Sequence, residues 1–359
     1  MKKKKTTIHD IAKHLNVTAS TVSRALNNNS RISDSTIKSV RETARKLNYQ
    51  PNTIAAALRK GKSSVVGIII PMADRNFFAS IIRGIEEVVN DAGYNVIICQ
   101  SNDSPEKEKA NINTLLESQV DCIIASYAKE TTEFNHYKEI VERDVPLILF
   151  DRLHENLKSL NVDAVVIDDY LGAYMATQHL IEQGCRRIVH FSGSQHVSIY
   201  KERKRGYIDA LIQNNIDLDE TLILESDLIL PAGEELAGRL LNMTELPDGI
   251  FSSSDYAAIG AMGVLKQNQI KIPDQIAVVG FSNESFTSFV EPSLSTVDQL
   301  SKKMGQYAAH KFLDIMNNRN NAHTPTKTVL KPELIVRKSS LRTIGEKLIS
   351  ISKKQDVDR

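Results

Sequence analysis

From position 64 onward, short apolar runs alternate with amphipathic segments, and this alternation restricts the folds that the chain can adopt. The run VVGIII (65–70) is apolar along its whole length, and the segment 77–92 after it repeats apolar residues at helical spacing. Strands that are apolar on both faces and separated by helices predict parallel sheets covered by helices on both sides. A core of about 280 residues exceeds the usual domain size, so we expect two Rossmann-like subdomains. The expected strands are 64–70, 94–100, 120–126, 145–151, 164–167, 186–191, 222–226, 249–253, 275–281 and 326–337, and the expected helices are 77–92, 106–119, 134–143, 169–183, 201–214, 232–241, 255–268 and 300–316.

The first 26 residues have a different pattern, which predicts two short helices joined by a tight turn. Apolar residues recur at helical spacing over 8–15 and again over 22–26, and Asn16-Val17 interrupts the pattern. Thr7 and Thr18 precede the two helices, where a hydroxyl can accept a hydrogen bond from a free backbone N–H. Such a pair is typical of a helix-turn-helix, whose second helix fits the major groove of DNA, although a generic helical hairpin is the alternative. The second helix presents small side chains and one guanidinium to a base edge: Thr18, Ala19, Ser20, Thr21, Ser23 and Arg24.

A third helix, capped by Ser33 or Asp34 and running to about Leu47, is expected because a helix-turn-helix needs one to close its small core. Pro51 ends this region, since proline forces the preceding residue out of the helical conformation. The alanine-rich stretch after it lacks an apolar face and is expected to be a linker that becomes a short helix only when stabilised. The expected domains are an all-α DNA-binding domain (1–50), a hinge (51–62), a core (63–342) and a tail (343–359), the core dividing into an N-subdomain (63–163 plus 296–325) and a C-subdomain (164–295 plus 326–342).

The charge of the chain is divided unevenly between its two parts. Residues 1–62 contain 14 Lys and Arg but only 3 Asp and Glu, whereas the remainder contains 31 basic and 41 acidic residues. A basic N-terminal part joined to an acidic body is typical of a nucleic-acid-binding segment attached to another domain.

Other classes of protein are disfavoured by what the sequence lacks. The three cysteines, at 99, 122 and 185, form no CxxC pair and predict neither a disulfide framework nor a metal site. The Lys-rich N-terminus precedes no apolar region, and the apolar runs are too short to cross a bilayer, so we expect a soluble cytoplasmic protein. The remnant of a phosphate-binding loop at 61–63 lacks its first glycine, and no nucleophile or dinucleotide motif occurs. We therefore expect no cofactor, no metal and no enzymatic activity.

Several motifs together make the sequence resemble the LacI/GalR family of bacterial transcriptional regulators over about 6–342. They are TIHDIAKHLNVTASTVSRALN, RETARKLNYQPN, NFFASIIRGIEE, GYNVIICQSNDSPEKE, FSSSDYAAIGAM and IPDQIAVVGFSN. The resemblance implies a homodimer that binds a pseudo-palindromic DNA operator and a periplasmic-binding-protein-like core that senses a small molecule, usually a sugar or a nucleoside. It also implies base contacts from Thr18, Ala19, Ser20 and Arg24, and a hinge leucine, Leu58, that wedges between base pairs.

Two positions depart from the family pattern. In the hinge, Asn52 and Ala55 match, but Ala56 replaces the usual arginine, so Arg59 or Lys60 is expected to make its contact. In the core, many members have an aspartate that accepts hydrogen bonds from ligand hydroxyls, and here Ser282 stands at that position. A serine donates as well as accepts and carries no charge, so the ligand contact must differ.

The effector site is expected where the carboxyl ends of the strands from the two subdomains face each other. Arg203 is expected to bind hydroxyls or a carboxylate, although neighbouring charges make a solvated basic patch the alternative. Phe77 is expected to cover an apolar sugar face or else to be core, and Asp255 is expected to cap the helix that follows it if it does not bind ligand. The candidates are Asn76, Phe77, Asp151, Arg203, Asp255, Ser282 and Asn283.

These features predict an allosteric transcription regulator, a repressor controlled by a sugar or sugar derivative, with a slight preference for an acidic or oligomeric sugar over a plain hexose. One alternative is a soluble sugar-binding receptor with the same core, which the basic N-terminal helices disfavour. Another is a regulator whose effector is a phosphocarrier protein or a nucleoside. Val197 and Ile199 stand where the family's purine-responsive members have polar residues, which disfavours a purine.

Overall fold

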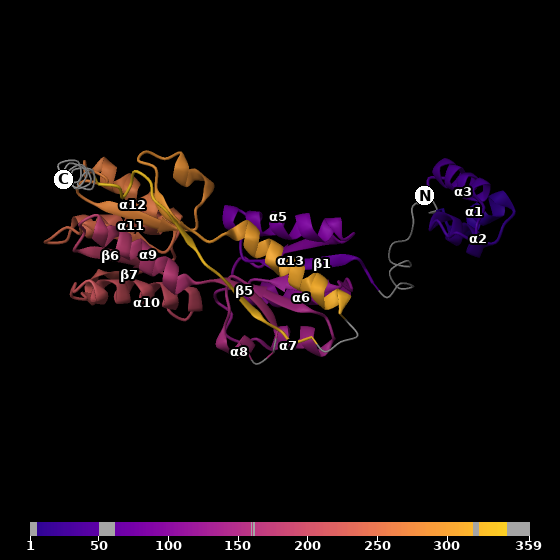
Figure 1. Cartoon of the computed structure of the whole chain (residues 1–359), viewed down its shortest axis with the longest axis horizontal. Coiled ribbons are helices and arrows are strands. Elements are labelled where there is room, and N and C mark those ends of the chain that lie inside the picture. Colours follow the sequence, from indigo (N-terminus) through magenta and orange to yellow (C-terminus); the bar gives the residue numbers. More distant parts are fainter. Residues whose placement is uncertain (1–5, 50–61, 159, 161, 319–322, 343–359) are drawn as a thin grey trace, which may run out of the picture. The chain divides into compact units, whose positions relative to one another are not determined.

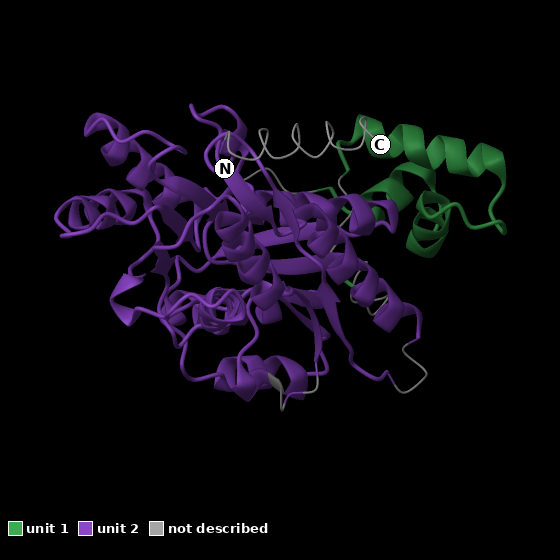
Figure 2. Cartoon of the chain, turned by 60° about the vertical axis from the view of Figure 1, so that its left-hand side comes forward, with its two compact units in different colours: residues 1–63 green, residues 64–359 purple. Residues whose placement is uncertain are grey.

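The computed structural model describes residues 6–49, 62–158, 160, 162–318 and 323–342, which belong to two compact units, 1–63 and 64–359 (Figure 2). The first unit contains α1 (Ile8–Leu15), α2 (Ala19–Leu26) and α3 (Asp34–Lys46). The hydroxyls of Thr7, Thr18 and Ser33 each accept a hydrogen bond from the backbone N–H three residues later, which confirms the expected caps. The apolar faces of the three helices meet in one core, formed by Ile11, Ala12, Val22, Ala25, Val40 and Ala44.

The second unit contains two six-stranded sheets, as the alternation of strands and helices predicts (Figure 1). The first sheet has the order β11-β5-β4-β3-β1-β2, and all its neighbouring strands are parallel. Its strands are β1 (Val65–Ile70), β2 (Asn95–Gln100), β3 (Cys122–Ala125), β4 (Leu147–Phe150), β5 (Asp163–Ile167) and β11 (Lys327–Leu330).

The second sheet has the order β12-β10-β9-β8-β6-β7 and is parallel except at its edge, where β12 pairs antiparallel with β10. The expected parallel sheets are therefore confirmed, with one antiparallel strand at this edge. Its strands are β6 (Ile188–Ser192), β7 (Ile223–Glu225), β8 (Gly249–Ser252), β9 (Ala277–Phe281), β10 (Ser295–Asp298) and β12 (Glu333–Ile335).

Helices cover both faces of each sheet. The first sheet packs α5 and α13 on one face and α6 and α7 on the other, and the second sheet packs α9 and α10 opposite α11 and α12. The helices of this unit are α5 (Asn76–Asp91), α6 (Pro105–Glu117), α7 (Asn135–Glu142), α8 (Glu155–Lys158), α9 (Asp169–Glu182), α10 (Ser198–Gln213), α11 (Leu230–Leu241), α12 (Asp255–Gln267) and α13 (Ser301–Asn317), with short 3₁₀ turns at Glu220–Leu222 and Ser285–Ser288.

The chain crosses between the sheets at positions that differ from the expected subdomain boundaries. β5 and β11 belong to the first sheet and β10 to the second, so the boundaries at 163, 295 and 325 each fall on the wrong side of a strand. The expected strand 326–337 is two strands in two different sheets, because Lys331 and Pro332 interrupt it between β11 and β12. Within the described ranges, no helix is long and apolar enough to cross a membrane, and no group of three or more potential ligands is arranged to hold a metal ion.

Candidate functional site

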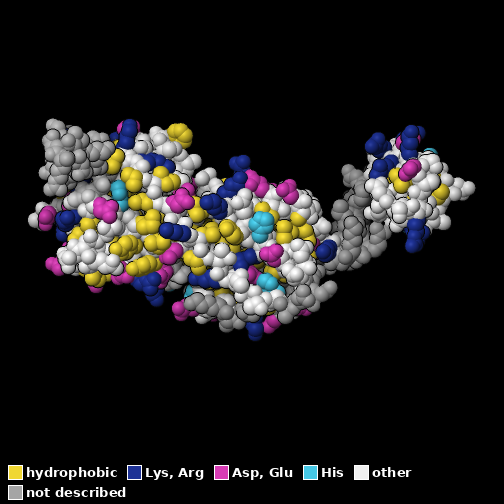
Figure 3. All heavy atoms as spheres, in the orientation of Figure 1, with side chains coloured by type: hydrophobic (Ala, Val, Ile, Leu, Met, Phe, Trp, Pro, Cys, Tyr) yellow, Lys and Arg dark blue, Asp and Glu magenta, His cyan; other side chains and the backbone are white. Residues whose placement is uncertain are grey.

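The outer face of α2 has the chemistry that the sequence predicts for reading DNA. Val22 and Ala25 turn into the core of the first unit, which leaves the small polar residues and Arg24 on the other side. The Thr18 hydroxyl bonds to those of Ser20 (2.8 Å) and Thr21 (2.9 Å), so the start of the helix is held in place. Arg24 is exposed in the last turn and forms no ion pair with any described residue, and Figure 3 shows other Lys and Arg side chains on the same unit. Asn52, Ala55, Leu58 and Arg59, the expected hinge contacts, lie outside the described residues.

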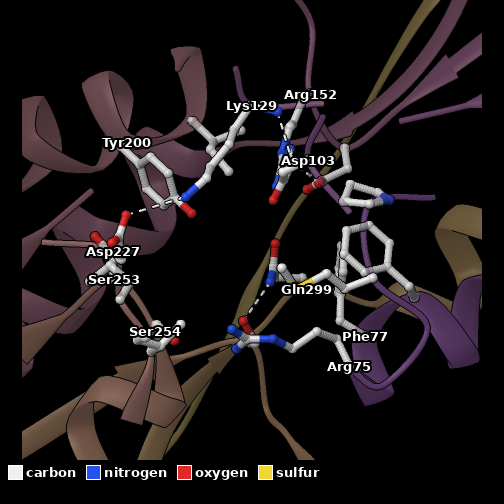
Figure 4. A pocket seen from close by; sticks show the side chains of 18 of the residues that line it. Arg75, Phe77, Asp103, Lys129, Arg152, Tyr200, Asp227, Ser253, Ser254 and Gln299 are labelled. Atoms are coloured by element: carbon white, nitrogen blue, oxygen red, sulfur yellow. Dashed lines mark hydrogen bonds and ion pairs between the residues drawn. The ribbon is translucent and has the colours of Figure 1, made fainter. Parts of the chain in front are cut away.

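A pocket lies in the second unit between the carboxyl ends of the two sheets, where the sequence predicts an effector site. Side chains from both subdomains point into it (Figure 4). Residues that follow β1 and β4 form one wall, and residues that follow β8, β9 and β10 form the other. Of the seven predicted effector residues, four line this pocket: Phe77, Asp151, Arg203 and Ser282.

Arg203 is 3% exposed, so the alternative of a solvated basic patch is wrong. Its Nη2 lies 2.7 Å from Oδ1 of Asp169, its Nη1 donates to the carbonyl of Ser253 (2.9 Å), and its Nη2 also donates to Oε1 of Gln299 (3.3 Å). The guanidinium lies 3.7 Å from the centre of the Phe281 ring, which gives it a cation–π contact. Arg203 is therefore fixed in one position, from which it can organise the neighbouring polar groups.

Asp151 and Phe77 lie on the opposite wall. Asp151 follows β4 in a left-handed conformation (φ 64°) and lines the pocket. Burial raises the pKa of this carboxyl, and the nearby Arg152 acts in the opposite direction. Phe77 is 7% exposed and packs edge-on against Phe78 with ring centres 5.0 Å apart, so it belongs to the core and to the pocket wall at once.

The other three predicted residues do not line the pocket. Asn76 is the exposed first residue of α5. Asp255 is fully buried and accepts hydrogen bonds from Thr296 Oγ1 (2.6 Å) and the backbone N–H of Glu284 (2.8 Å), while Ser254 is the N-cap residue, so Asp255 neither caps α12 nor faces the cleft. The Asn283 amide is held between Arg337 (2.9 Å) and Asp298 (3.0 Å). These two side chains tie the ends of strands together.

Sequence reasoning missed most of the charged residues in the pocket. Arg152 pairs with Asp103 at 2.6 Å, and Lys129 lies 3.3 Å from Asp227. Asp151 was predicted because it directly follows a strand, and the same rule could have found Arg152, the next residue. The other charged residues of the pocket lie at varying distances after their strands, so this rule does not find them. The missed residues also include Arg75, Tyr200, Ser253, Ser254, Glu284 and Gln299.

Three polar atoms of the pocket residues are buried without a hydrogen-bond partner among the described residues. They are Nε of Arg152, Oγ of Ser253 and Oε2 of Glu284. A buried polar atom without a hydrogen-bond partner costs about 1–3 kcal/mol, so a molecule bound in the pocket that supplies the missing partners gains affinity. One donor, one acceptor and one hydroxyl that can do either suit a ligand with several hydroxyl groups.

Comparison with known proteins gives the same two-part division. Residues 7–52 match the family described as "Bacterial regulatory proteins, lacI family", and residues 177–340 match the periplasmic binding protein-like domain. The chain is 33% identical to the HTH-type transcriptional regulator DegA of Bacillus subtilis (strain 168), over 94% of this chain and 98% of DegA. It is 33% identical to catabolite control protein A of Priestia megaterium, over 87% and 92% of the two chains.

Solved structures agree with the fold. The complex of the transcriptional regulator CelR with cellobiose superposes with a TM-score of 0.70 at 26% identity, covering 93% of this chain and 100% of that one. The lac repressor dimer bound to operator superposes with a TM-score of 0.82 at 22% identity, covering 94% and 100%. The exposed polar face of α2, the basic first unit and these similarities over nearly the whole chain lead to one conclusion: the chain belongs to the lacI family of bacterial regulatory proteins and is a DNA-binding transcription regulator.

Proposed function

We propose that this regulator is a repressor that binds a pseudo-palindromic operator as a homodimer, and that a sugar or sugar derivative in the cleft changes its affinity for that operator. Base contacts come from Thr18, Ala19, Ser20, Thr21 and Arg24. The hinge contacts come from Asn52, Ala55, Leu58 and Arg59. It acts in the cytoplasm and by binding alone, without catalysis.

The observation that carries the effector class is the set of buried polar atoms in the cleft that have no hydrogen-bond partner among the described residues. Arg152 Nε can donate, Glu284 Oε2 can accept, and Ser253 Oγ can do either. Phe77 and Tyr200 add aromatic surface to the same pocket (Figure 4). Sugars combine alternating hydroxyls with apolar C–H faces, so they match both parts of this lining. The ligand named in the CelR complex is the sugar cellobiose. The ribose operon repressor, which is 31% identical to this chain, is also named for a sugar.

The same cleft offers a route from effector to operator. The pocket walls belong to different subdomains, so a ligand that bridges them favours one arrangement of the two sheets over others. A ligand changes operator affinity only through such a difference in affinity for the two arrangements.

The test uses purified full-length protein and an operator selected from random DNA. Gel-shift titrations in the presence of neutral sugars, sugar acids and nucleosides should show that one sugar class changes operator affinity by at least about fivefold, a usual size for allosteric coupling. The change should disappear in the Arg152→Ala variant and persist in Arg143→Ala, whose side chain is exposed and pairs with Glu139 on α7. A response to nucleosides alone, or to no small molecule, contradicts the proposal.

A further inference from the structure

A second hollow lies beside the effector pocket of Figure 4, and the two share part of their lining. Its volume is about 610 Å³, against about 120 Å³ for the effector pocket. Its lining residues follow β4, end β5, follow β6 or belong to β11, so it also lies between the two subdomains. Asp151 and Ile199 line both spaces. We call the second space the outer hollow and use four of its residues below: His154, Tyr170, Gln195 and Val329.

The volume of the effector pocket limits the ligand that it can hold. One water-sized atom needs about 10–15 Å³ of such volume, so 120 Å³ has room for about ten, which is close to one sugar ring and too small for two. On one side the rim is closed, because Lys129 Nζ lies 3.3 Å from Asp227 and His196 Nε2 donates to the Lys129 carbonyl at 2.8 Å. A longer ligand therefore extends past Asp151 and Ile199 into the outer hollow.

Asp151 lies where the two spaces meet and has acceptor capacity to spare. It is 6% exposed, and among the described residues its carboxylate accepts one long hydrogen bond, from Ser126 Oγ at 3.4 Å. Its nearest cation contact, to Arg152 Nε, is 3.8 Å long. A carboxylate has about four acceptor sites. Hydroxyl groups of two adjoining sugar units can therefore both donate to Asp151.

His154 gives the outer hollow a donor. Its Nδ1 accepts from the backbone N–H of Asn156 at 3.2 Å, so the neutral imidazole carries its proton on Nε2. Among the described residues, nothing accepts that proton. The ring stacks on Phe134 with centres 4.7 Å apart, which fixes the plane of the ring.

Gln195 gives the outer hollow an acceptor. One atom of its amide contacts the carbonyl of Gly193 at 2.7 Å and Ser192 Oγ at 2.9 Å. A carbonyl oxygen only accepts, so this atom is the NH₂ group, and the remaining atom, Oε1, accepts from no described residue. Apolar surface lies beside these groups, since Val329 is 51% exposed and Tyr170 adds an aromatic ring. A donor, an acceptor and apolar surface together suit a sugar, which combines hydroxyls with apolar C–H faces.

We propose that the effector is an oligosaccharide of two or more units, with one unit in the effector pocket and the next in the outer hollow. His154 Nε2 donates to the second unit, Gln195 Oε1 accepts from it, and Val329 packs against its apolar face. Lys201 and Lys327 in the same lining are exposed, so the outer hollow opens to solvent and further units can extend outward. This inference rests on the proposed function, because it names the kind of sugar bound in the same cleft.

The experiment compares the affinities of the full-length protein for single sugars and for disaccharides that contain them, by titration calorimetry. The probes are D-glucose with cellobiose, maltose and trehalose, D-galactose with lactose and melibiose, D-fructose with sucrose, and D-xylose with xylobiose. Two additional hydrogen bonds are worth about tenfold in affinity. We therefore expect at least one disaccharide to bind about tenfold more tightly than its single units and to change operator affinity in a gel shift.

A filling variant tests where the second unit binds. Val329→Trp places a large ring in the outer hollow, so it should weaken disaccharide binding by at least about tenfold, the whole gain from the second unit. It should leave the affinity for the single sugar nearly unchanged, since Val329 does not line the effector pocket. Val141→Trp, at a position 36% exposed on α7, is the matched control and should change neither affinity.

A second variant removes the donor alone. His154→Ala deletes one hydrogen bond to the second unit, so the disaccharide should bind about fivefold more weakly while the single sugar binds as before. His310→Ala, at an exposed position of α13, is the matched control and should bind both as wild type does. Thermal melts of all four variants check that they fold.

Each outcome decides a different claim. Single sugars that bind and change operator affinity, with no disaccharide binding more tightly, overturn this inference and leave the proposed function standing. A disaccharide preference that survives both Val329→Trp and His154→Ala, or a loss that is equal for the single sugar, overturns the assignment of the outer hollow. Absence of binding and of any operator response across the whole set overturns the proposed function together with the inference.

Discussion

Lys129 Nζ lies 3.3 Å from Asp227 Oδ1 across the cleft, although the two residues follow strands of different sheets. The same rim has a second bridge, in which His196 Nε2 bonds to the backbone carbonyl of Lys129 at 2.8 Å. Elsewhere on the pocket, Arg75 of the first subdomain stacks on Tyr256 of the second. These contacts join the two subdomains around the pocket, so a ligand that enters or leaves past this rim must break some of them.

The Lys129–Asp227 pair should therefore affect rates more than stability. Asp227→Asn removes the ion pair, and because the Asp227 side chain is 74% exposed, the free energy of unfolding should change by less than about 1 kcal/mol. The effector should dissociate several-fold faster, as measured by stopped-flow displacement. Glu142→Gln, which removes an exposed ion pair with Lys138 on α7, is the control and should leave the dissociation rate unchanged. Equal rates in wild type and Asp227→Asn would show that the pair does not hold the rim closed.

Asp255 predicts a pH dependence of stability. Burial raises the pKa of this carboxyl to about 7, against the lowering effect of its hydrogen bonds from Thr296 and Glu284. The unfolded chain has a pKa of about 3.9 at this residue, so between about pH 4 and 7 the folded state binds more protons. Stability should therefore fall as pH rises through this window.

Asp255→Asn tests this dependence, since an asparagine can donate to Thr296 and accept from Glu284 as a protonated aspartate does. Urea unfolding at pH 5, 6, 7 and 8 should show a smaller loss of stability in the variant than in wild type. Asp274→Asn, at an exposed position, is the control and should follow wild type. Parallel curves for Asp255→Asn and wild type would mean that this carboxyl does not titrate in the window.

The sequence predicts the elements of the fold well because the local pattern determines them. The caps at Thr7, Thr18 and Ser33 need only a hydroxyl three residues before a free N–H, and the structure confirms all three. The sheet to which a strand belongs is not a local property. β10 and β11 are both short strands near the carboxyl end of the core, and only pairing with distant strands assigns them to different sheets.

In the effector site, too, the sequence predicts the residues placed by a local pattern and misses those placed by long-range contacts. Asp151 and Ser282 were predicted because each directly follows an apolar strand, and both line the pocket. The pairing of Asp103 with Arg152 joins loops 49 positions apart, and that of Lys129 with Asp227 joins loops 98 positions apart. No spacing rule connects such residues. Asp255 was misplaced because its contact with Thr296, which buries it, comes from the strand β10.

The conformation of Ser282 predicts a stabilising substitution that lowers effector affinity. Glycine adopts a φ of 127° without strain, so Ser282→Gly should recover about 1–3 kcal/mol and lose about 0.5–1 kcal/mol to chain entropy. The free energy of unfolding should therefore rise by about 1 kcal/mol in urea titrations, while the affinity for the effector falls. Ser288→Gly, in an exposed turn without positive φ, should be slightly less stable than wild type. A loss of stability in Ser282→Gly equal to that in Ser288→Gly would remove the argument from strain.

The exposed face of α2 predicts how the protein recognises its operator. Arg24 lies in the last turn of α2, forms no ion pair with a described residue and follows the small side chains that let the helix approach the bases. Arg24→Ala should weaken binding to the selected operator by about 1–3 kcal/mol, and it should weaken binding to random DNA much less, because a guanidinium that bonds to a guanine edge distinguishes sequences.

Arg45→Ala, in the last turn of α3, removes an exposed charge outside α2 and should lower both affinities by similar factors. Gel shifts at two salt concentrations separate the two effects, since the loss of a phosphate contact reduces the salt dependence and the loss of a base contact does not. Equal losses on operator and random DNA for Arg24→Ala would assign Arg24 to the phosphate backbone and leave base reading to Thr18, Ser20 and Thr21.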